Sequence, residues 1–465
     1  MRLALINAWH TFAGGSAPHL SASIPLACLY LASACKRAGH EVSVVDAFSY
    51  GCLPAIIRNG TKMLYYTGMP ILVNDKEEVV LVGGDIGAIL SILRFCEPDI
   101  IGFSVTFSSL HYFLPLIVKA FRINFPNAKL VIGGSHATSA PEIVLNSVDV
   151  DYVVAGEGEV SFVKLLDMIE KGEEPKGVPG IYYKKDEQIQ STPYELIENL
   201  DDIYPPDYLA IPLDYHYALQ GYKQVQMMTS RGCPFNCHFC TVPMISKRKW
   251  RAHSAKRVLG ELERFVYSGV ERILFEDDNM AIDQDRFVDI LEGIIRKHWN
   301  LSLLVPQGLH VSTLTFEVLK LMSFAGFKEV TISPESGNER VAKEEMNKTF
   351  LPCDAKEVVK NIIKAEMRPF VNFVIGMPNE RWDEILDTIN YARELKELGV
   401  RKFHFALATP IVGNKIYKDL VVSSRIKDEV PSFTTYYSPL FDGIDWKAKD
   451  LFDLRNAADA ELNVG

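Results

Sequence analysis

The sequence predicts an α/β protein with a doubly wound parallel sheet, then a partial (β/α)6 barrel related to the TIM barrel, and a small carboxyl-terminal extension. The chain of 465 residues is too long for one ordinary core. Apolar strand-like runs alternate with helical runs up to about residue 185, and a second alternating series begins at residue 224. We therefore expect a first domain over 1–187, a linker over 188–223, a barrel over 224–410 and an extension over 411–465.

The amino-terminal series reads as strand, helix, strand. A first β-α-β unit consists of LALIN, a helical run from Pro25 to Lys36, and EVSVVDA. The buried strand PDIIGFSVT follows, then a helix near 109–125, and then KLVIGG and VDYVVAG, each of which ends in glycine before another helical stretch. Fully apolar strands separated by helices indicate a parallel, Rossmann-like sheet.

In doubly wound sheets, ligands bind outside the carboxyl ends of the strands. Small residues at those ends let a large ligand approach the backbone. The candidate binding residues of this domain are Ser104, Thr106, Gly133, Gly134, Ser135, Gly156, Glu157 and Gly158.

Two segments do not fit the alternation. Residues 51–85 interrupt it and read as an insertion or a lid. The Pro- and Tyr-rich stretch from Gln188 to Tyr222 is typical of an interdomain linker with little regular structure.

The second series contains six strand-like runs, VQMMTS, RILFEDD, LSLLVPQ, EVTISP, FVNFVIG and KFHFAL. Amphipathic stretches separate them, for example at 254–267, 286–297, 313–324 and 355–366. Six such repeats indicate a partial barrel, whose catalytic groups lie at the carboxyl ends of the strands. Polar residues gather at those ends: Cys233, Asp277, Asp278, Gln307, Glu335, Ser336 and Glu380.

Composition limits the partners and the compartment. A formal charge of −10 argues against a nucleic-acid partner. The one dense basic patch, KRKWR from Lys247 to Arg251, reads either as a solvated loop or as a contact for an anion or substrate. No apolar run reaches the roughly 20 residues that span a bilayer, and Met1 leads straight into a strand, so we expect a cytoplasmic protein with reduced thiols.

The segment RGCPFNCHFC places Cys233, Cys237 and Cys240 at C-x3-C-x2-C spacing, which is typical of metal ligands. Electron-transfer 4Fe–4S sites use four thiolates. Three thiolates leave one iron with an open position for chemistry. A zinc site with His238 or His253 as fourth ligand, or a chance cluster, are the alternatives.

The other five cysteines are scattered, and we expect them to be small core hydrophobes. They are Cys28, Cys35, Cys52, Cys96 and Cys353.

The cysteine loop resembles the hallmark of the radical S-adenosylmethionine (SAM) superfamily, and the resemblance covers residues 224 to about 410. Phe239, directly before the third cysteine, fits that pattern. The resemblance implies that the open iron of a 4Fe–4S cluster binds the amino and carboxylate groups of SAM. It also implies cleavage of SAM to methionine and a 5′-deoxyadenosyl radical, with electrons from a donor such as flavodoxin or ferredoxin.

Three further segments look like superfamily motifs. FEDDNM places Asp277 and Asp278 at the methionine amino group, PESGNER places Glu335 and Ser336 at the ribose or carboxylate, and VIGMPNE places Ile375 and Met377 near adenine. Each has a plain alternative, in which Asp277 caps a turn, Ser336 caps the next helix or Gly376 forms a turn. The expected cofactor contacts in the barrel are Phe239, Asp277, Asp278, Gln307, Glu335, Ser336, Ile375 and Met377.

The amino-terminal segments IPLACLYLASACKRAGHEVSVVDA, EPDIIGFSVTFSS, KLVIGGSHAT and VDYVVAGEGE look like the cobalamin-binding domain of one radical SAM subclass. The histidine motif D-x-H-x-x-G that ligates cobalt in other cobalamin domains is missing. The nearest string starts at Asp214 and contains His216, but Leu219 replaces its glycine. The resemblance therefore implies cobalamin without a histidine lower ligand. A nucleotide-binding or vestigial domain is the alternative, although neither G-x-G-x-x-G nor a P-loop occurs.

Together the two domains resemble class B radical SAM methyltransferases. The implied reaction is hydrogen abstraction from an unactivated carbon by the 5′-deoxyadenosyl radical, followed by methyl transfer from methylcobalamin. The alternatives are a cobalamin-using cyclase, oxidase or rearrangement enzyme, a cobalamin-free thiolation or oxidation enzyme, and a non-catalytic Fe–S or metal-binding interaction protein.

The substrate is open between a peptide or protein, a lipid, a tetrapyrrole and a natural product, with a slight preference for a peptide or protein carbon. Aromatic residues of the extension either line a substrate pocket or pack against the barrel. They are Phe433, Tyr436, Tyr437, Phe441 and Trp446.

Overall fold

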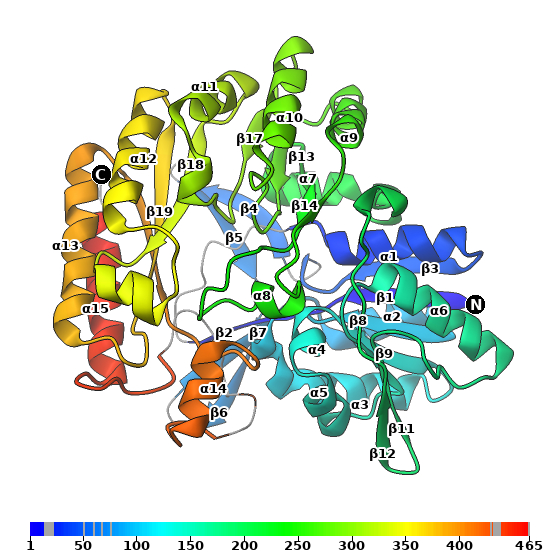
Figure 1. Cartoon of the computed structure of the whole chain (residues 1–465). Helices are drawn as coiled ribbons and strands as arrows, with labels where there is room; N and C mark the ends of the chain where they lie inside the picture. The colour runs from blue at the N-terminus through cyan, green and yellow to red at the C-terminus, as the bar shows by residue number, and fades with distance from the viewer. Residues whose placement is uncertain are drawn as a thin grey trace. The chain divides into compact units, whose positions relative to one another are not determined.

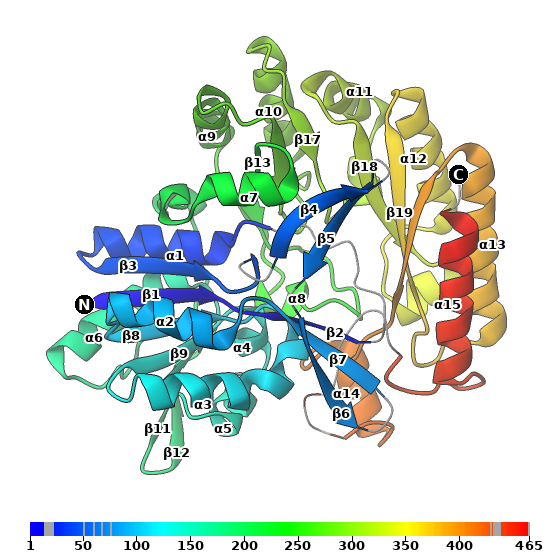
Figure 2. The ribbon, with the colours of Figure 1, turned by 180° about the vertical axis from the view of Figure 1, so that it is seen from behind.

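The computed structural model describes residues 1–13, 23–49, 52–58, 61–66, 68–74, 77–427, 430 and 439–463 (Figures 1 and 2). Its contacts divide the chain into two compact units. The first holds residues 1–198 and 202–222, and the second holds residues 199–201 and 223–465. Within the described ranges, no helix is both long enough and apolar enough to cross a bilayer.

The first unit is built on a seven-stranded sheet, and its five parallel strands confirm the predicted doubly wound fold. In space the parallel strands follow the order β3-β1-β8-β9-β10, which is the 2-1-3-4-5 order of flavodoxin-like sheets. An antiparallel hairpin, β11 and β12, extends the β10 edge. The bounds are β1 Arg2–Asn7, β3 Glu41–Asp46, β8 Ile100–Ser104, β9 Lys129–Gly133, β10 Tyr152–Val154, β11 Ile181–Lys185 and β12 Gln188–Ser191.

Helices connect the parallel strands and bury their apolar faces on the sheet. Helix α1 contacts α6, and α2 contacts α3. Leu29 on α1, Leu93 on α2 and Phe121 on α3 are fully buried. The bounds are α1 Leu26–Arg37, α2 Ile86–Cys96, α3 Leu114–Asn124, α4 Ser135–Ser139, α5 Pro141–Ser147 and α6 Gly158–Lys171.

The interrupting segment forms antiparallel strands. One pair is β4 and β5, and a three-stranded sheet has the order β2-β7-β6. Figure 2 shows these strands in blue beside the parallel sheet of their own unit. The bounds are β2 His10–Ala13, β4 Cys52–Arg58, β5 Thr61–Tyr66, β6 Gly68–Asn74 and β7 Glu77–Val82.

The stretch expected to lack regular structure contains the strand β12 and the helix α7 (Leu213–Gln220), so that expectation is wrong for these residues. The hairpin before β12 turns through Asp186 and Glu187, both with positive φ (49° and 62°). A turn made without glycine or asparagine gave no signal in the sequence.

The second unit contains six parallel strands, as predicted for a partial (β/α)6 barrel. They form two three-stranded sheets, β13-β16-β17 and β18-β19-β20. Parallel bridges from Leu303 to Phe327 and from Leu309 to Ile332 connect the two sheets. The strand bounds are β13 Gln224–Met227, β16 Arg272–Phe275, β17 Ser302–Leu304, β18 Glu329–Glu335, β19 Arg368–Ile375 and β20 Lys402–Leu407.

Helices alternate with these strands (Figure 1). Two short strands, β14 (Ser230–Arg231) and β15 (Arg251–Ala252), pair antiparallel. The cysteine loop is the segment of chain between them. The helix bounds are α8 Val242–Ile245, α9 Ala255–Tyr267, α10 Gln284–Arg296, α11 Phe316–Ala325, α12 Pro352–Lys364, α13 Trp382–Leu398, α14 Lys415–Val422 and α15 Ala448–Leu462.

The scattered cysteines divide into two groups. Cys28 and Cys35 are buried, which confirms their role as core residues. Cys96 is half-buried and Cys353 is exposed, so the expectation is wrong for Cys353, which lies on the solvent side of α12. The side chain of Cys52 lies outside the described residues.

Two aromatic residues of the extension are buried in the second unit. Phe441 and Trp446 pack together with ring centroids 6.0 Å apart, and the Trp446 indole N–H donates to the carbonyl of Glu380 at 2.8 Å. Packing against the barrel is therefore confirmed for these two. Phe433, Tyr436 and Tyr437 lie outside the described residues.

Candidate active site

The loop that carries the three cysteines follows the first barrel strand. It starts at Gly232, whose φ of +86° and close approach to the carbonyl of Lys249 leave no room for a side chain. Cys233, Cys237 and Cys240 are all half-buried on this loop. The backbone at Gly232 therefore makes a turn that requires glycine.

Asp277, at the end of β16, holds the start of this loop. Its carboxylate accepts hydrogen bonds from the Thr229 N–H (3.0 Å), the Thr229 hydroxyl (2.7 Å) and the Ser230 hydroxyl (2.5 Å). Asp277 is fully buried. These three bonds anchor the start of the loop, and the expected contact of Asp277 with the methionine of SAM stays a prediction.

Asp278 differs from its neighbour. One carboxylate oxygen accepts the backbone N–H of Gly232 at 2.8 Å, and the side chain is exposed. A contact with methionine is compatible with this position and stays a prediction.

The cysteine sulfurs lie in surroundings that disfavour a free thiolate. Burial raises the pKa of Cys233 to about 11 and that of Cys240 to about 12. The Cys240 sulfur accepts the backbone N–H of Val242 at 3.4 Å. Iron ligation requires thiolates and releases their protons, so a cluster bound here would have to supply the compensating positive charge.

A second part of the site is formed by the carboxyl end of β18 and the segment that follows it. Glu335 has a left-handed φ of +69°, which is strained for a residue with a side chain, and it is buried. Its carboxylate lies 3.2 Å from the Lys348 ammonium. Burial lowers the pKa of Lys348, but Glu335 and Cys237 raise it more, so the net shift is upward and the lysine stays charged.

Lys348 was not identified from the sequence. Its ammonium lies over the rings of Phe239 (5.4 Å) and Phe350 (5.5 Å). It is thus a buried cation beside the cysteines, able to pair with a carboxylate. Nothing in its sequence context separates it from nearby surface lysines such as Lys343.

Ser336 follows Glu335 but is used within the protein. It is fully buried, and its hydroxyl accepts the backbone N–H of Asn338 at 3.1 Å and lies 3.1 Å from the Thr388 hydroxyl. The capping alternative is therefore observed, and the expected contact of Ser336 with ribose or carboxylate stays a prediction.

The end of β19 is braced by Glu380. Its carboxylate accepts the backbone N–H groups of Gly376 (2.7 Å) and Met377 (2.9 Å), and burial raises the pKa of Glu380 to about 8. Gly376 turns the chain with a φ of +84°. The side chains of Ile375 and Met377 are buried, and their place near adenine stays a prediction.

At the end of the third strand, the Gln307 amide donates to Glu276 at 3.0 Å. Gln307 is exposed and Glu276 is half-buried. The motif FEDDNM predicted roles for Asp277 and Asp278 but none for Glu276, which lies between two buried residues.

The carboxyl-terminal extension also holds the cysteine loop. The Asn414 amide, at the start of α14, donates to the Phe239 carbonyl at 3.0 Å, and the Lys415 N–H donates to the His238 carbonyl at 3.2 Å. The contact of Phe239 with cofactor stays a prediction.

In the first unit, several expected binding residues serve the fold. A side chain on Gly134 would meet the carbonyl of Val105, and one on Gly158 would meet Leu31. The Glu157 carboxylate accepts the backbone N–H of Ile197 at 2.7 Å.

Packing within the chain therefore already requires glycine at Gly134 and Gly158, and their contact with a ligand stays a prediction. A side chain on Gly156 would likewise meet Tyr194, and the contact of Gly156 with a ligand also stays a prediction.

The other candidates at this sheet edge are more open. Thr106 and Ser135 are exposed, Gly133 is half-buried, and Ser104 is buried at the end of β8. Their contact with a cofactor stays a prediction.

The same edge carries an aromatic and histidine cluster that the sequence analysis missed. His10 stacks on Phe48 at 4.0 Å and meets the edge of Phe107 at 5.0 Å. Phe107 is 46% exposed, so a flat apolar face reaches solvent where doubly wound sheets bind ligands.

A second histidine cluster lies at the ends of β8 and β9. His111 Nδ1 lies 3.0 Å from His136 Nε2, and His136 Nδ1 lies 3.0 Å from the Ser108 hydroxyl. Burial lowers the pKa of His136 to about 3, so it is neutral.

His216, the histidine of the nearest cobalt-binding string, is not available to a ligand on the surface. It is fully buried on α7, with its Nε2 3.7 Å from a carboxylate oxygen of Asp46.

Comparison with known proteins matches both units. The Radical SAM superfamily profile matches residues 227–392, and the B12 binding domain profile matches residues 70–166. The chain is 32% identical over 363 residues to the uncharacterized methyltransferase PH0819 of Pyrococcus horikoshii, covering 76% of this chain and 77% of that protein. It is 25% identical to the cytidylyl-2-hydroxyethylphosphonate methyltransferase of Streptomyces wedmorensis, covering 95% of this chain and 86% of that protein.

Solved structures share the fold. The radical SAM methyltransferase TsrM of Kitasatospora setae aligns with a TM-score of 0.69 at 16% identity, covering 93% of this chain and 78% of its own. The cobalamin-dependent SAM radical enzyme OxsB aligns with a TM-score of 0.70 at 14% identity, covering 98% of this chain and 65% of its own.

The fold, the three-cysteine loop and these matches define a radical SAM enzyme with a cobalamin-binding domain. The chain belongs to the family of cobalamin-dependent radical SAM methyltransferases. Its cofactors are accordingly a 4Fe–4S cluster, SAM and cobalamin, and the zinc and cobalamin-free alternatives are set aside.

Proposed function

We propose that the protein methylates an unactivated carbon of a small organic molecule. The observation that carries this proposal is the three-thiol loop beside the buried Lys348–Glu335 pair, in a chain that also has a cobalamin-binding unit. When bound, the cluster and SAM supply the 5′-deoxyadenosyl radical, and cobalamin supplies the methyl group.

The residues of the chain position and shield this chemistry. Cys233, Cys237 and Cys240 are the proposed iron ligands. Lys348 is the proposed partner of the SAM carboxylate, because it is the cation whose charge acts on all three cysteines. Asp278 is the proposed acceptor for the SAM amino group, since its carboxyl is exposed beside Gly232.

The names of the relatives favour a small substrate over a peptide. One relative is named for cytidylyl-2-hydroxyethylphosphonate, and the TsrM structure holds tryptophan. We therefore propose a small organic molecule and not a peptide or protein carbon, and both compounds are the first substrates to test.

The experiment uses the reconstituted full chain with cobalamin, a reductant and SAM carrying a deuterated methyl group. Methyl transfer predicts that SAM yields both 5′-deoxyadenosine and S-adenosylhomocysteine. The methylated substrate should carry three deuterium atoms, which make it heavier than the same product formed from unlabelled SAM. Formation of 5′-deoxyadenosine without any S-adenosylhomocysteine would refute the methyl transfer.

A cyclase is the second candidate, because the chain is also 26% identical to the anaerobic magnesium-protoporphyrin IX monomethyl ester cyclase of Cereibacter sphaeroides. That match covers 64% of this chain and half of the cyclase. A cyclase would consume SAM without producing S-adenosylhomocysteine, so the same assay separates the two functions.

A further inference from the structure

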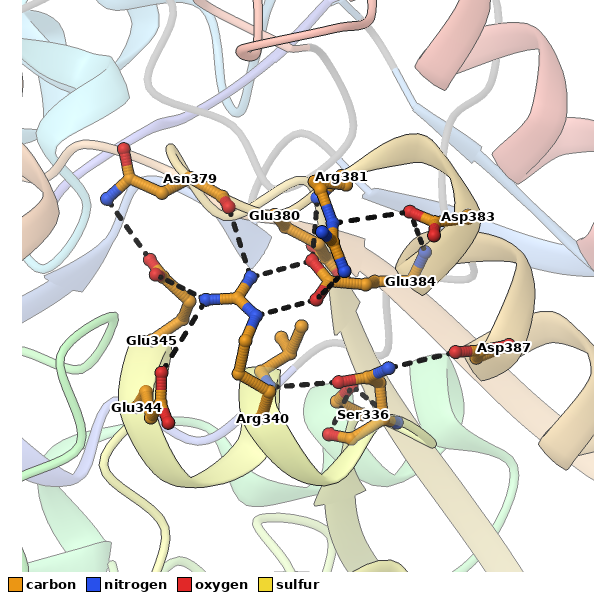
Figure 3. Close-up of polar contacts among 12 residues, drawn as sticks. Ser336, Arg340, Glu344, Glu345, Asn379, Glu380, Arg381, Asp383, Glu384 and Asp387 are labelled. Carbon is orange, nitrogen blue, oxygen red and sulfur yellow. Dashed lines mark hydrogen bonds and ion pairs between the residues drawn. The ribbon is translucent and has the colours of Figure 1, made fainter.

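Arg340 lies at the centre of an ion-pair network that joins three parts of the second unit (Figure 3). Its guanidinium makes two bonds of 2.6 Å to the carboxylate of Glu384, at the start of α13. It also donates to the Glu345 carboxylate at 3.1 Å and to the Asn379 carbonyl at 3.1 Å. No motif in the sequence analysis assigned a role to this residue.

Arg340 begins the segment that faces the cysteine loop. A π-turn, Val341–Glu345, follows it and is closed by a hydrogen bond from the Met346 N–H to the Val341 carbonyl at 2.9 Å. Such turns are rare and often occur at functional sites. Lys348 comes two residues after Met346.

The end of this π-turn holds the middle of the cysteine loop. The Glu345 carbonyl lies 2.7 Å from His238 Nδ1, and the Met346 carbonyl accepts the His238 N–H at 3.1 Å. The Asn347 amide donates to the Asn236 carbonyl at 2.9 Å. Both loop residues lie between Cys233 and Cys240.

The charges explain why a guanidinium is needed at this place. Glu345 and Glu384 both approach Arg340, and the buried carboxyl of Glu380 lies near enough for their charges to raise its pKa. Arg340 holds the pKa of Glu384 at about 2. Without the guanidinium, the carboxylates would repel each other, and the π-turn would lose its link to α13.

We propose that Arg340 is a positioning residue of the SAM site. It fixes the π-turn against α13 and the β19 end, and the π-turn in turn fixes His238 on the cysteine loop and places Lys348 beside the sulfurs. This inference depends on the cluster and SAM, and not on methyl transfer, so it can fail or hold independently of the proposed reaction.

The test compares R340Q and R340K with a matched control, R393Q. Arg393 also makes a two-pronged pair, with Glu461 at 2.7 and 2.8 Å, but on the exposed side of α13. Iron content, SAM affinity and the electron paramagnetic resonance (EPR) spectrum of the reduced cluster with and without SAM are measured on reconstituted full-length protein.

We expect R340Q to keep all three cysteine ligands and its iron, but to bind SAM about tenfold more weakly. The change that SAM causes in the EPR spectrum should be reduced. R340K, which keeps the charge but not the two-pronged geometry, should lose less affinity. R393Q should match the wild type in SAM affinity and in its spectrum.

Wild-type SAM affinity and an unchanged EPR response in R340Q, with only a lower melting temperature, would overturn the proposal. If R340Q does not fold, R340K and E384Q decide by the same two measurements. Unchanged SAM binding in both of them would equally overturn it.

Discussion

Replacing Asp277 by alanine removes the carboxylate that holds the start of the cysteine loop. Three donors, the Thr229 N–H and the hydroxyls of Thr229 and Ser230, would lose a fully buried acceptor. Hydrogen bonds to a charged group contribute about 1.5–3 kcal/mol each, and breaking a buried charged network costs about 3–5 kcal/mol. Because the three hydrogen bonds form one buried network, we expect D277A to lower the free energy of unfolding by about 3–5 kcal/mol.

For a unit of this size, each kcal/mol shifts the melting temperature by about 2–4 °C, so D277A should melt about 10 °C lower. The assay is differential scanning calorimetry, together with iron content after reconstitution, which should also fall. D289A is the control, because Asp289 is an exposed carboxylate on helix α10 with no assigned role in the site. A D277A protein with wild-type melting and iron, but weak SAM binding, would refute the anchoring role and favour a direct contact with SAM.

Three other changes test the site. G232A should fail to load iron, because the φ of +86° at Gly232 and the adjacent carbonyl exclude a side chain. The control G260A, on helix α9, should load iron normally, because nothing lies within 4 Å of the added methyl group. Equal iron content in the two variants would contradict this prediction. The pKa of Glu380 is about 8 in the folded protein, whereas an unperturbed glutamate, as in the unfolded chain, has a pKa of 4.5. Between pH 4.5 and 8, the carboxyl of Glu380 is therefore protonated in the folded state and ionised in the unfolded state. Stability should fall with rising pH by roughly 1 kcal/mol per unit, and E380Q should flatten the dependence of melting temperature on pH; an unchanged slope would contradict it. K348M should weaken SAM binding about tenfold with iron retained, while K343M on the neighbouring π-turn should not, and similar affinities would remove Lys348 from the SAM site.

The sequence was sufficient to predict the parallel strands of both units and the cysteine loop. The six barrel strands and five parallel sheet strands are short apolar runs bounded by glycine or polar residues, and burial on both faces requires such runs. The three cysteines lie within eight residues, so their proximity does not depend on tertiary structure.

The roles of single polar residues depended on tertiary structure. Asp277 and Asp278 are adjacent in the same motif, yet one is fully buried and the other exposed. Ser336 is satisfied by Thr388, 52 residues away, and Lys348 by Glu335 across a π-turn. Local spacing and composition contain no signal for either pairing, so the burial and the partners of Ser336 and Lys348 could not be predicted from the motifs.

The hydrogen bonds from Asn414 and Lys415 to the cysteine loop determine where a fragment that contains only the barrel can end. A fragment trimmed at residue 410, after the sixth strand, would retain every cysteine but lose the amide that holds the carbonyl of Phe239. Expression of the barrel by itself should therefore extend beyond Val422, the end of α14, if the loop is to assemble its iron.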